Sequence, residues 1–219
     1  MAAPSAKAQL LTMIANRSFG LGEFKLSSGG TSDYYIDCRM TTLHAEGARL
    51  TGRVVLDIIR EEQWLPEAIG GMTMGADPIV TAVNVLSSQE FKMRDSSRKG
   101  NRVTRELYLN AKLIHGFLVR KAEKIHGTGR RIEGFLQKEA KVVIVDDVCT
   151  TGISTIQAIE AARGAGMNVV GVICLVEREE AGGREAVERA AYPAPVISIF
   201  KASEVRAEHL KNNQVVSHK

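Results

Sequence analysis

The chain has 219 residues, 44% of them hydrophobic and 25% charged, which suits one globular domain with a sizeable core over residues 1–219. No apolar run approaches the roughly 18 residues of a membrane span, so we expect a cytoplasmic protein without a membrane segment. Three widely spaced cysteines without a CxxC pair indicate no disulfide framework or zinc site, and a net charge of +4 held in local basic runs suits a polyphosphate substrate as well as nucleic acid.

Apolar residues at helical spacing predict amphipathic helices in the first part of the chain. A segment rich in Ser, Gly and Thr around Tyr34 and Tyr35 predicts short strands or an ordered loop. Asp77 followed by Pro78 predicts a helix start, because Asp is a favourable N-cap and Pro suits the first helical position. The expected elements are helices at 8–15 and 44–62, strands or a loop at 23–39, a strand at 68–71 and a helix at 79–86.

The second half alternates apolar β-branched runs with helical patterns. The expected elements are strands at 116–120, 142–145, 169–176 and 196–200, a helix at 153–163 closed by Gly164 or Gly166, and a short last helix capped by Ser203. A strand, helix and second strand in this order form a βαβ unit. Because the strands are continuously apolar, we expect an α/β fold with a mostly parallel, buried sheet, whose ligands bind beyond the carboxyl ends of the strands.

The segment 142–155, VVIVDDVCTTGIST, holds the most informative chemistry. Asp146 and Asp147 come where a buried strand is expected to end. Two adjacent carboxylates at such a position destabilise the fold unless a bound ligand brings positive charge to them. The following TTG and helix start offer hydroxyls, close backbone N–H groups and a positive helix end, which together form a phosphate cradle. The segment therefore suits a ligand with vicinal hydroxyls and a monophosphate. The plainer alternative is a solvated loop with an Asp N-cap, and the Walker A and GxGxxG patterns are absent here.

This segment resembles the signature of type I phosphoribosyltransferases that binds 5-phosphoribosyl 1-diphosphate (PRPP). Three further stretches occur in the order and approximate spacing of orotate phosphoribosyltransferases: FKLSSGGTSDYYID (24–37), VRKAEKIHGTGRRIEG (119–134) and LVEREEAGG (175–183). The resemblance covers nearly all of the chain apart from roughly residues 89–113. It implies a type I phosphoribosyltransferase fold, with a mostly parallel central sheet flanked by helices, a small hood region at about 1–40 and a core at about 41–219.

The resemblance also implies a reaction and a set of site residues. The two acids would hold the ribose hydroxyls, residues 150–154 would hold the 5-phosphate, and a catalytic loop would close over the pyrophosphate. The implied catalytic residues are Lys124, His126, Asp146 and Asp147. The implied PRPP-binding residues are Arg120, Lys121, Lys124, His126, Asp146, Asp147, Val148, Cys149, Thr150, Thr151, Gly152, Ile153 and Ser154. The implied orotate-binding residues are Ser27, Tyr35, Ile36, Thr150 and Arg178.

The implied cofactor is Mg²⁺, chelated mainly by PRPP, with no protein ligand assigned to it. The implied partners are PRPP, orotate and a second copy of the chain, since the catalytic loop often reaches the neighbouring subunit's active site in this family. We expect a homodimer and neither a membrane nor a nucleic-acid partner. The product would be orotidine 5-monophosphate, in pyrimidine (UMP) biosynthesis.

Each of these residues also has a plainer interpretation. The basic stretch around Arg120 could be a solvated face, Tyr34 and Tyr35 could pack in the core, and Arg178 could lie on the surface. Two lysines common in the family are missing, because Ser27 occupies one position and residues 72–77 read MTMGAD. The basic segment 89–113 could be a solvated insertion, an extra helix at 102–112 or an RNA- or partner-binding patch. The competing functions are a phosphoribosyltransferase for another base and a PRPP-sensing regulator that binds nucleic acid.

Overall fold

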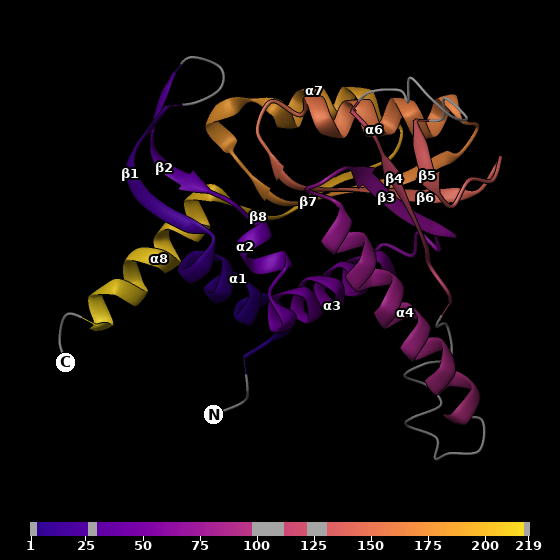
Figure 1. Cartoon of the computed structure of the whole chain (residues 1–219), viewed down its shortest axis with the longest axis horizontal. Helices are drawn as coiled ribbons and strands as arrows, with labels where there is room; N and C mark the ends of the chain where they lie inside the picture. The colour runs from indigo at the N-terminus through magenta and orange to yellow at the C-terminus, as the bar shows by residue number, and fades with distance from the viewer. Residues whose placement is uncertain (1–3, 26–29, 98–111, 122–130, 217–219) are drawn as a thin grey trace.

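The computed structural model describes residues 4–25, 30–97, 112–121 and 131–216. A six-stranded sheet with the order β5-β4-β3-β6-β7-β8 forms the centre, and a two-stranded antiparallel sheet, which we call the hood, stands at one end (Figure 1). In the central sheet every neighbouring pair is parallel except β4 with β5. The strands are β1 Phe19–Lys25 and β2 Thr31–Ile36 of the hood, and β3 Ala68–Met72, β4 His115–Val119, β5 Ile132–Gly134, β6 Lys141–Cys149, β7 Asn168–Glu177 and β8 Val196–Lys201 of the central sheet.

Helices cover both faces of the central sheet (Figure 1). They are α1 Ala6–Arg17, α2 Arg39–Thr42, α3 Ala45–Glu61, α4 Asp77–Ser97, α6 Ile153–Gly164, α7 Gly183–Ala191 and α8 Ala202–Val216, with a short 3₁₀ turn, η1, at Glu179–Ala181. Alternate side chains of β6 point to opposite faces of the sheet, as in any β-strand, and so pack against the helices on either side. Val143 and Val145 pack in the core that includes α1, α3 and α4, whereas Val142 and Ile144 pack in the core that includes α6 and α7. The sheet is therefore buried on both faces.

The predicted α/β architecture with a mostly parallel buried sheet is confirmed. The helix predicted at 153–163 ends at Gly164, and Gly166 follows it with φ +81°, a left-handed conformation that favours glycine. The segment 23–39 contributes to both hood strands and to the start of α2, with residues 26–29 outside the described part. Within the described residues, no helix is long and apolar enough to span a membrane.

Three expectations were wrong in detail. Strand β6 continues to Cys149 instead of ending at Val145, because its partner β7 also continues and pairs Cys174 with Asp146. Ser203 does not cap the last helix, since β8 runs directly into α8 and places Ser203 in its first turn. The carboxylate of Glu204 accepts the N–H of Lys201 instead. The last helix is also 15 residues long, not short.

Several elements were not anticipated. Strand β5 has only three residues, and α7 is short and buries Gly183, Val187 and Ala191, of which only Val187 is a large apolar side chain. Helix α4 runs to Ser97, well past the predicted end at residue 86 and into the basic segment. Residues 98–111 of that segment lie outside the described part, so its proposed extra helix and binding patch stay predictions.

Candidate active site

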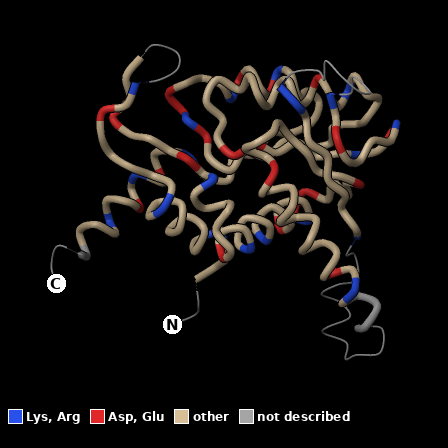
Figure 2. Tube along the Cα trace, viewed as in Figure 1, with Lys and Arg blue, Asp and Glu red and all other residues tan. Residues whose placement is uncertain are grey.

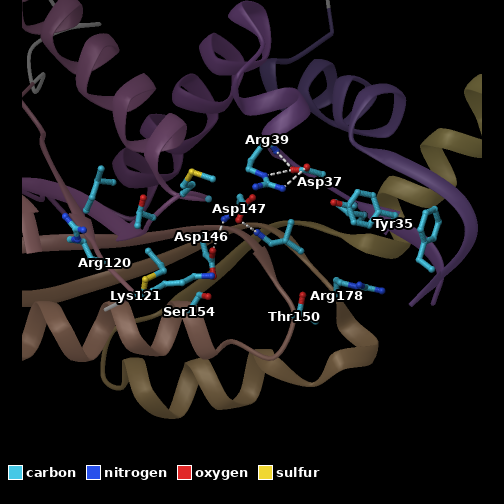
Figure 3. Close-up of a pocket in the computed structure, with 18 of the residues that line it drawn as sticks. Tyr35, Asp37, Arg39, Arg120, Lys121, Asp146, Asp147, Thr150, Ser154 and Arg178 are labelled. Carbon is cyan, nitrogen blue, oxygen red and sulfur yellow. Dashed lines mark hydrogen bonds and ion pairs between the residues drawn. The ribbon is translucent and has the colours of Figure 1, made fainter. Parts of the chain in front are cut away.

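A cavity of about 980 Å³ lies at the carboxyl ends of the central strands, between them and the hood. Figure 3 shows its side chains converging from both sheets and from α2. Strands β3, β4, β6 and β7 each contribute residues at or just beyond their ends. The lining residues are Phe24, Lys25, Tyr35, Ile36, Asp37, Arg39, Met72, Thr73, Met74, Gly75, Leu118, Arg120, Lys121, Glu133, Asp146, Asp147, Val148, Thr150, Ser154 and Arg178.

Two acids, in the second half of β6, stand at the floor of this cavity. Asp146 is 7% exposed and accepts a hydrogen bond of 2.5 Å from the hydroxyl of Thr155. Burial raises the pKa of Asp146 to about 7, and burial also raises the pKa of Asp147, although the charge of Arg39 opposes that second rise. Two poorly solvated carboxylates suit a ligand that brings hydroxyl donors or a cation.

The loop after the acids is shaped by close backbone packing. Gly152 precedes α6 with φ +77°, and its carbonyl accepts the N–H of Ile156 to begin the helix. A Cβ on Gly183, at the start of α7, would lie 2.1 Å from the carbonyl oxygen of Thr150. The start of α7 therefore presses against the loop from behind and holds it at the N-terminal end of α6, where backbone N–H groups attract anions.

The predicted residues of this loop differ in where their side chains lie. Val148, Thr150 and Ser154 line the cavity. Cys149 is 2% exposed and packs in the core that includes α6, while Ile153 is 59% exposed. Thr151 is also exposed and Gly152 is buried. Of the predicted residues 148–154, only Val148, Thr150 and Ser154 therefore line the cavity.

At the end of β4, Arg120 and Lys121 line the cavity opposite the hood. The Nη1 of Arg120 lies 3.4 Å from Oε1 of Glu133 on β5. The structure therefore brings these two cations to the same cavity as the acids. Lys124 and His126 lie outside the described residues, as does Ser27.

Arg178 follows β7 and joins the core to the hood. It is 9% exposed, donates to the hydroxyl of Tyr34 over 3.0 Å and to that of Ser32 over 2.9 Å, and ion-pairs with Glu180. Its guanidinium carbon also stands 4.5 Å from the centre of the Tyr34 ring. Burial and the hydrogen bond to Glu180 raise the pKa of Tyr34 to about 12. The interpretation of Arg178 as a surface arginine was wrong.

The two tyrosines differ in their surroundings. Tyr34 is 8% exposed and stacks on Phe19 with ring centroids 5.4 Å apart, so core packing describes it correctly. Tyr35 is 48% exposed and lines the cavity together with Ile36, so core packing does not describe it. Successive residues of a strand face opposite sides of the sheet. Tyr34 and Tyr35 are successive residues of β2, so one packs in the core and the other lines the cavity.

Sequence reasoning missed several lining residues, among them Phe24, Lys25, Asp37, Arg39 and Thr73. Asp37 ends the family stretch 24–37, and Arg39 lies just beyond that stretch. The available signal was a carboxylate and an arginine at the end of the segment 23–39, which was predicted to form short strands or an ordered loop. Among the described residues, no group of three or more His, Cys, Asp or Glu side chains forms a metal-binding cluster.

Fold and sequence together define the class of protein. A model of the phosphoribosyl transferase domain matches residues 117–207, which run from β4 into α8 and include the acids, the loop and Arg178. With the mostly parallel sheet flanked by helices and the separate hood, the chain has the type I phosphoribosyltransferase fold.

Similar proteins narrow the class. The orotate phosphoribosyltransferase of Aquifex aeolicus (strain VF5) is 38% identical over 200 residues, covering 90% of this chain and 96% of that protein. The enzyme of the same name from Rhodopseudomonas palustris (strain BisB5) is 38% identical over 208 residues, covering 93% and 98%. The crystal structure of Mycobacterium tuberculosis H37Rv orotate phosphoribosyltransferase with Fe(III) dicitrate aligns with a TM-score of 0.69 and 31% identity, covering 92% of this chain and 99% of that one. The chain belongs to the orotate phosphoribosyltransferase family, as the sequence predicts.

Proposed function

We propose that this enzyme transfers ribose 5-phosphate from PRPP to orotate, giving orotidine 5-monophosphate and diphosphate in pyrimidine biosynthesis. The observation that supports this function most directly is that one cavity holds both an acidic site beside a phosphate loop and an arginine. The floor of the cavity holds the buried Asp146 and the partly buried Asp147 beside the loop at the start of α6, and its hood side holds Arg178. A sugar phosphate and a carboxylated base fit these two halves.

On the sugar side, the carboxylates of Asp146 and Asp147 accept hydrogen bonds from the ribose hydroxyls. Thr150 and Ser154, with the backbone N–H groups between them, hold the 5-phosphate at the positive end of α6. The structure of the M. tuberculosis enzyme was solved in complex with PRPP and aligns with a TM-score of 0.64 and 27% identity over 94% of this chain, which supports PRPP as the ligand.

On the base side, Arg178 binds the carboxylate of orotate, since a guanidinium offers an anion a planar, charged pair of donors. Its partners in the hood keep its head near Tyr35 and Ile36, which line the same space. Thr150 stands between the two halves of the cavity. We retain Ser27 as a base-side residue, on the ground of family resemblance alone.

The reaction displaces diphosphate at the ribose C1 by N1 of the base, and negative charge builds on the leaving group. Arg120, Lys121, Lys124 and His126 stabilise that charge, with Lys124 as the main contributor. The cavity is lined by carboxylate oxygens, which are the kind of ligand that Mg²⁺ prefers. Mg²⁺ bound with PRPP supplies further positive charge to the diphosphate.

We also propose that the enzyme works as a homodimer in which the catalytic loop after Lys121, with Lys124 and His126, reaches the neighbouring active site. An apolar groove of about 760 Å³ between α2, α3 and α4 supports an interface on this side of the molecule. Leu43, Met74 and Val85 line it and are 72%, 66% and 51% exposed, which is unusual for large apolar side chains that have no partner.

A spectrophotometric assay of orotate loss with PRPP and Mg²⁺ tests the function, run in parallel with adenine, hypoxanthine and uracil. We expect turnover that requires PRPP and is fastest with orotate. Turnover of another base without turnover of orotate would reassign the base. Binding of PRPP without turnover of any base, together with salt-sensitive binding of RNA, would instead identify a regulator.

A further inference from the structure

The cavity has a third region besides the sugar and base sides, formed by the loop 73–75 between β3 and α4. This loop contains no Lys or Arg, and it lies directly on one of the acids. A Cβ on Gly75 would stand 2.2 Å from Oδ1 of Asp147, so only a glycine permits this approach. The region therefore presents backbone and a carboxylate to any ligand, and an anion bound there needs a cation from elsewhere.

Arg39, the first residue of α2, supplies that cation. It lines the main cavity, and with Met74 it also lines the neighbouring apolar groove, so its side chain lies at the boundary beside the loop. Figure 3 shows Arg39 and Asp37 directly above Asp147. Burial raises the pKa of the Asp147 carboxyl, and the positive charge of Arg39 is among the smaller influences that lower it, which is consistent with the two groups being close.

Asp37 holds this arginine in one orientation. Its Oδ1 accepts from Nε of Arg39 over 2.8 Å, and its Oδ2 accepts from Nη2 over 2.9 Å. The backbone N–H of Arg39 also donates to Oδ1, over 3.0 Å. This fork uses one edge of the guanidinium, so Nη1 is outside it, and the side chain is 43% exposed. Arg39 is thus oriented in advance and still accessible to a ligand.

The other cations of the cavity serve different regions. In Figure 3, Arg120 and Lys121 lie to one side of the two acids and Arg178 lies to the other, near Tyr35. Arg178 has a 10% exposed side chain and bonds to the hood. Arg39 stands between these groups, next to the acid that approaches the loop.

We propose that Arg39 binds the diphosphate group of PRPP, and the diphosphate product, at the loop 73–75, with Asp37 as the residue that positions it. The assignment rests on the proposed function, in which PRPP occupies the cavity. A guanidinium donates to phosphate oxygens with both charge and direction, which a loop of uncharged residues does not.

Isothermal titration with inorganic diphosphate and with ribose 5-phosphate, both in the presence of Mg²⁺, tests the proposal. We expect Arg39→Ala to weaken diphosphate binding about tenfold to hundredfold, the effect of losing one hydrogen bond to a charged group, and to change ribose 5-phosphate binding less than about twofold. Arg39→Lys, which keeps the charge and loses the fork, should fall between Arg39→Ala and the wild type. Arg17→Ala is the control, because Arg17 is exposed at the end of α1 and lines neither the cavity nor the apolar groove.

Unchanged diphosphate binding in Arg39→Ala would overturn the proposal. Equal loss for both ligands would also overturn it, because that pattern indicates general damage to the site. The outcome of the turnover assay with the four bases does not depend on the outcome of this binding experiment. If the wild type uses a base other than orotate while Arg39→Ala still loses diphosphate selectively, the base assignment is wrong and the role of Arg39 stands.

Discussion

At the scale of single residues, burial determines the chemistry of the acids in the cavity. Asp146 has one hydroxyl partner and the N–H of Asp147, and it lies beside a second carboxylate. These contacts do not replace the water that an exposed carboxylate would have, which is why its pKa rises to about 7. The sequence motif identified the residue, but its degree of burial depends on the layers of helices above and below β6.

This burial predicts a stability effect that depends on pH. The folded-state pKa of Asp146 is raised, so its ionised form destabilises the fold above about pH 7, and this destabilisation declines as pH falls through 7 and is lost near the ordinary pKa of 3.8. We expect Asp146→Asn to be more stable than the wild type at pH 8, by on the order of 1–3 kcal/mol, and this advantage to shrink towards pH 5. Urea unfolding at the two pH values measures it.

Asp33→Asn serves as the control for this experiment, since Asp33 has a 67% exposed side chain in a surface ion pair with Arg206. Its unfolding free energy should change little and equally at both pH values. An Asp146→Asn protein that is less stable at pH 8 than the wild type would contradict the assignment of a strained, desolvated carboxylate.

Lys124 is predicted from family resemblance alone, because it lies outside the described residues. If it is the main cation on the leaving diphosphate, Lys124→Ala should lower kcat on the order of 10²-fold or more, the effect of losing one preorganised charged donor. Lys138→Ala, a surface lysine beside Gly166, should leave kcat unchanged. Steady-state kinetics with orotate and PRPP distinguish the two, and a wild-type rate in Lys124→Ala would reject the role.

At the scale of elements, apolar continuity made β6 and β7 predictable. Strands buried on both faces need apolar residues at nearly every position, and such continuous apolar runs can be seen directly in the sequence of β6 and β7. Helix α7 was missed because four of its nine residues are charged, Val187 is its only large apolar side chain, and its position depends on distant partners. Arg184 of α7 donates to Glu177 of β7 and to the carbonyl of Val196 of β8, contacts that exist only after β7 and β8 are paired.

The contact between α7 and the phosphate loop gives an element-scale prediction. Gly183→Ala places a methyl group 2.1 Å from the carbonyl oxygen of Thr150, so the loop or α7 must move. We expect kcat/KM for PRPP to fall about tenfold or more through displacement of the loop. Gly164→Ala is the matched control, since a Cβ there meets no atom within 4 Å, and its kinetics should match those of the wild type. Unchanged kinetics for PRPP in Gly183→Ala would show that the loop tolerates the shift.

At the scale of the whole molecule, a few long-range contacts join the hood to the core. Arg178 bonds to Ser32 and Tyr34 of β2, and Arg206 of α8 pairs with Asp33 over 2.7 Å. Figure 2 shows basic and acidic positions interspersed along the described trace. Specific pairs, more than a broad field of one sign, therefore hold the base side of the cavity in place.

The proposed dimer predicts complementation between two defective subunits. Lys124→Ala and Asp147→Asn subunits should each be nearly inactive alone. If the catalytic loop serves the neighbouring site, a refolded equal mixture contains mixed dimers with one complete site, and we expect roughly a quarter of wild-type activity. Analytical ultracentrifugation provides the control that dimers of the 23.8 kDa chain have formed. Dimers without recovered activity would indicate that each loop serves its own subunit.

The sequence by itself determined the layered α/β fold, the family and the acids with their phosphate loop, because these depend on apolar period and on contiguous residues. Tertiary structure alone decided which side chains share the cavity. Arg39 and Asp37 face Asp147, Arg178 is buried against Tyr34, and α7 supports the loop from behind. Such contacts join residues far apart in the chain, and their geometry depends on strand order and register, which local patterns do not encode.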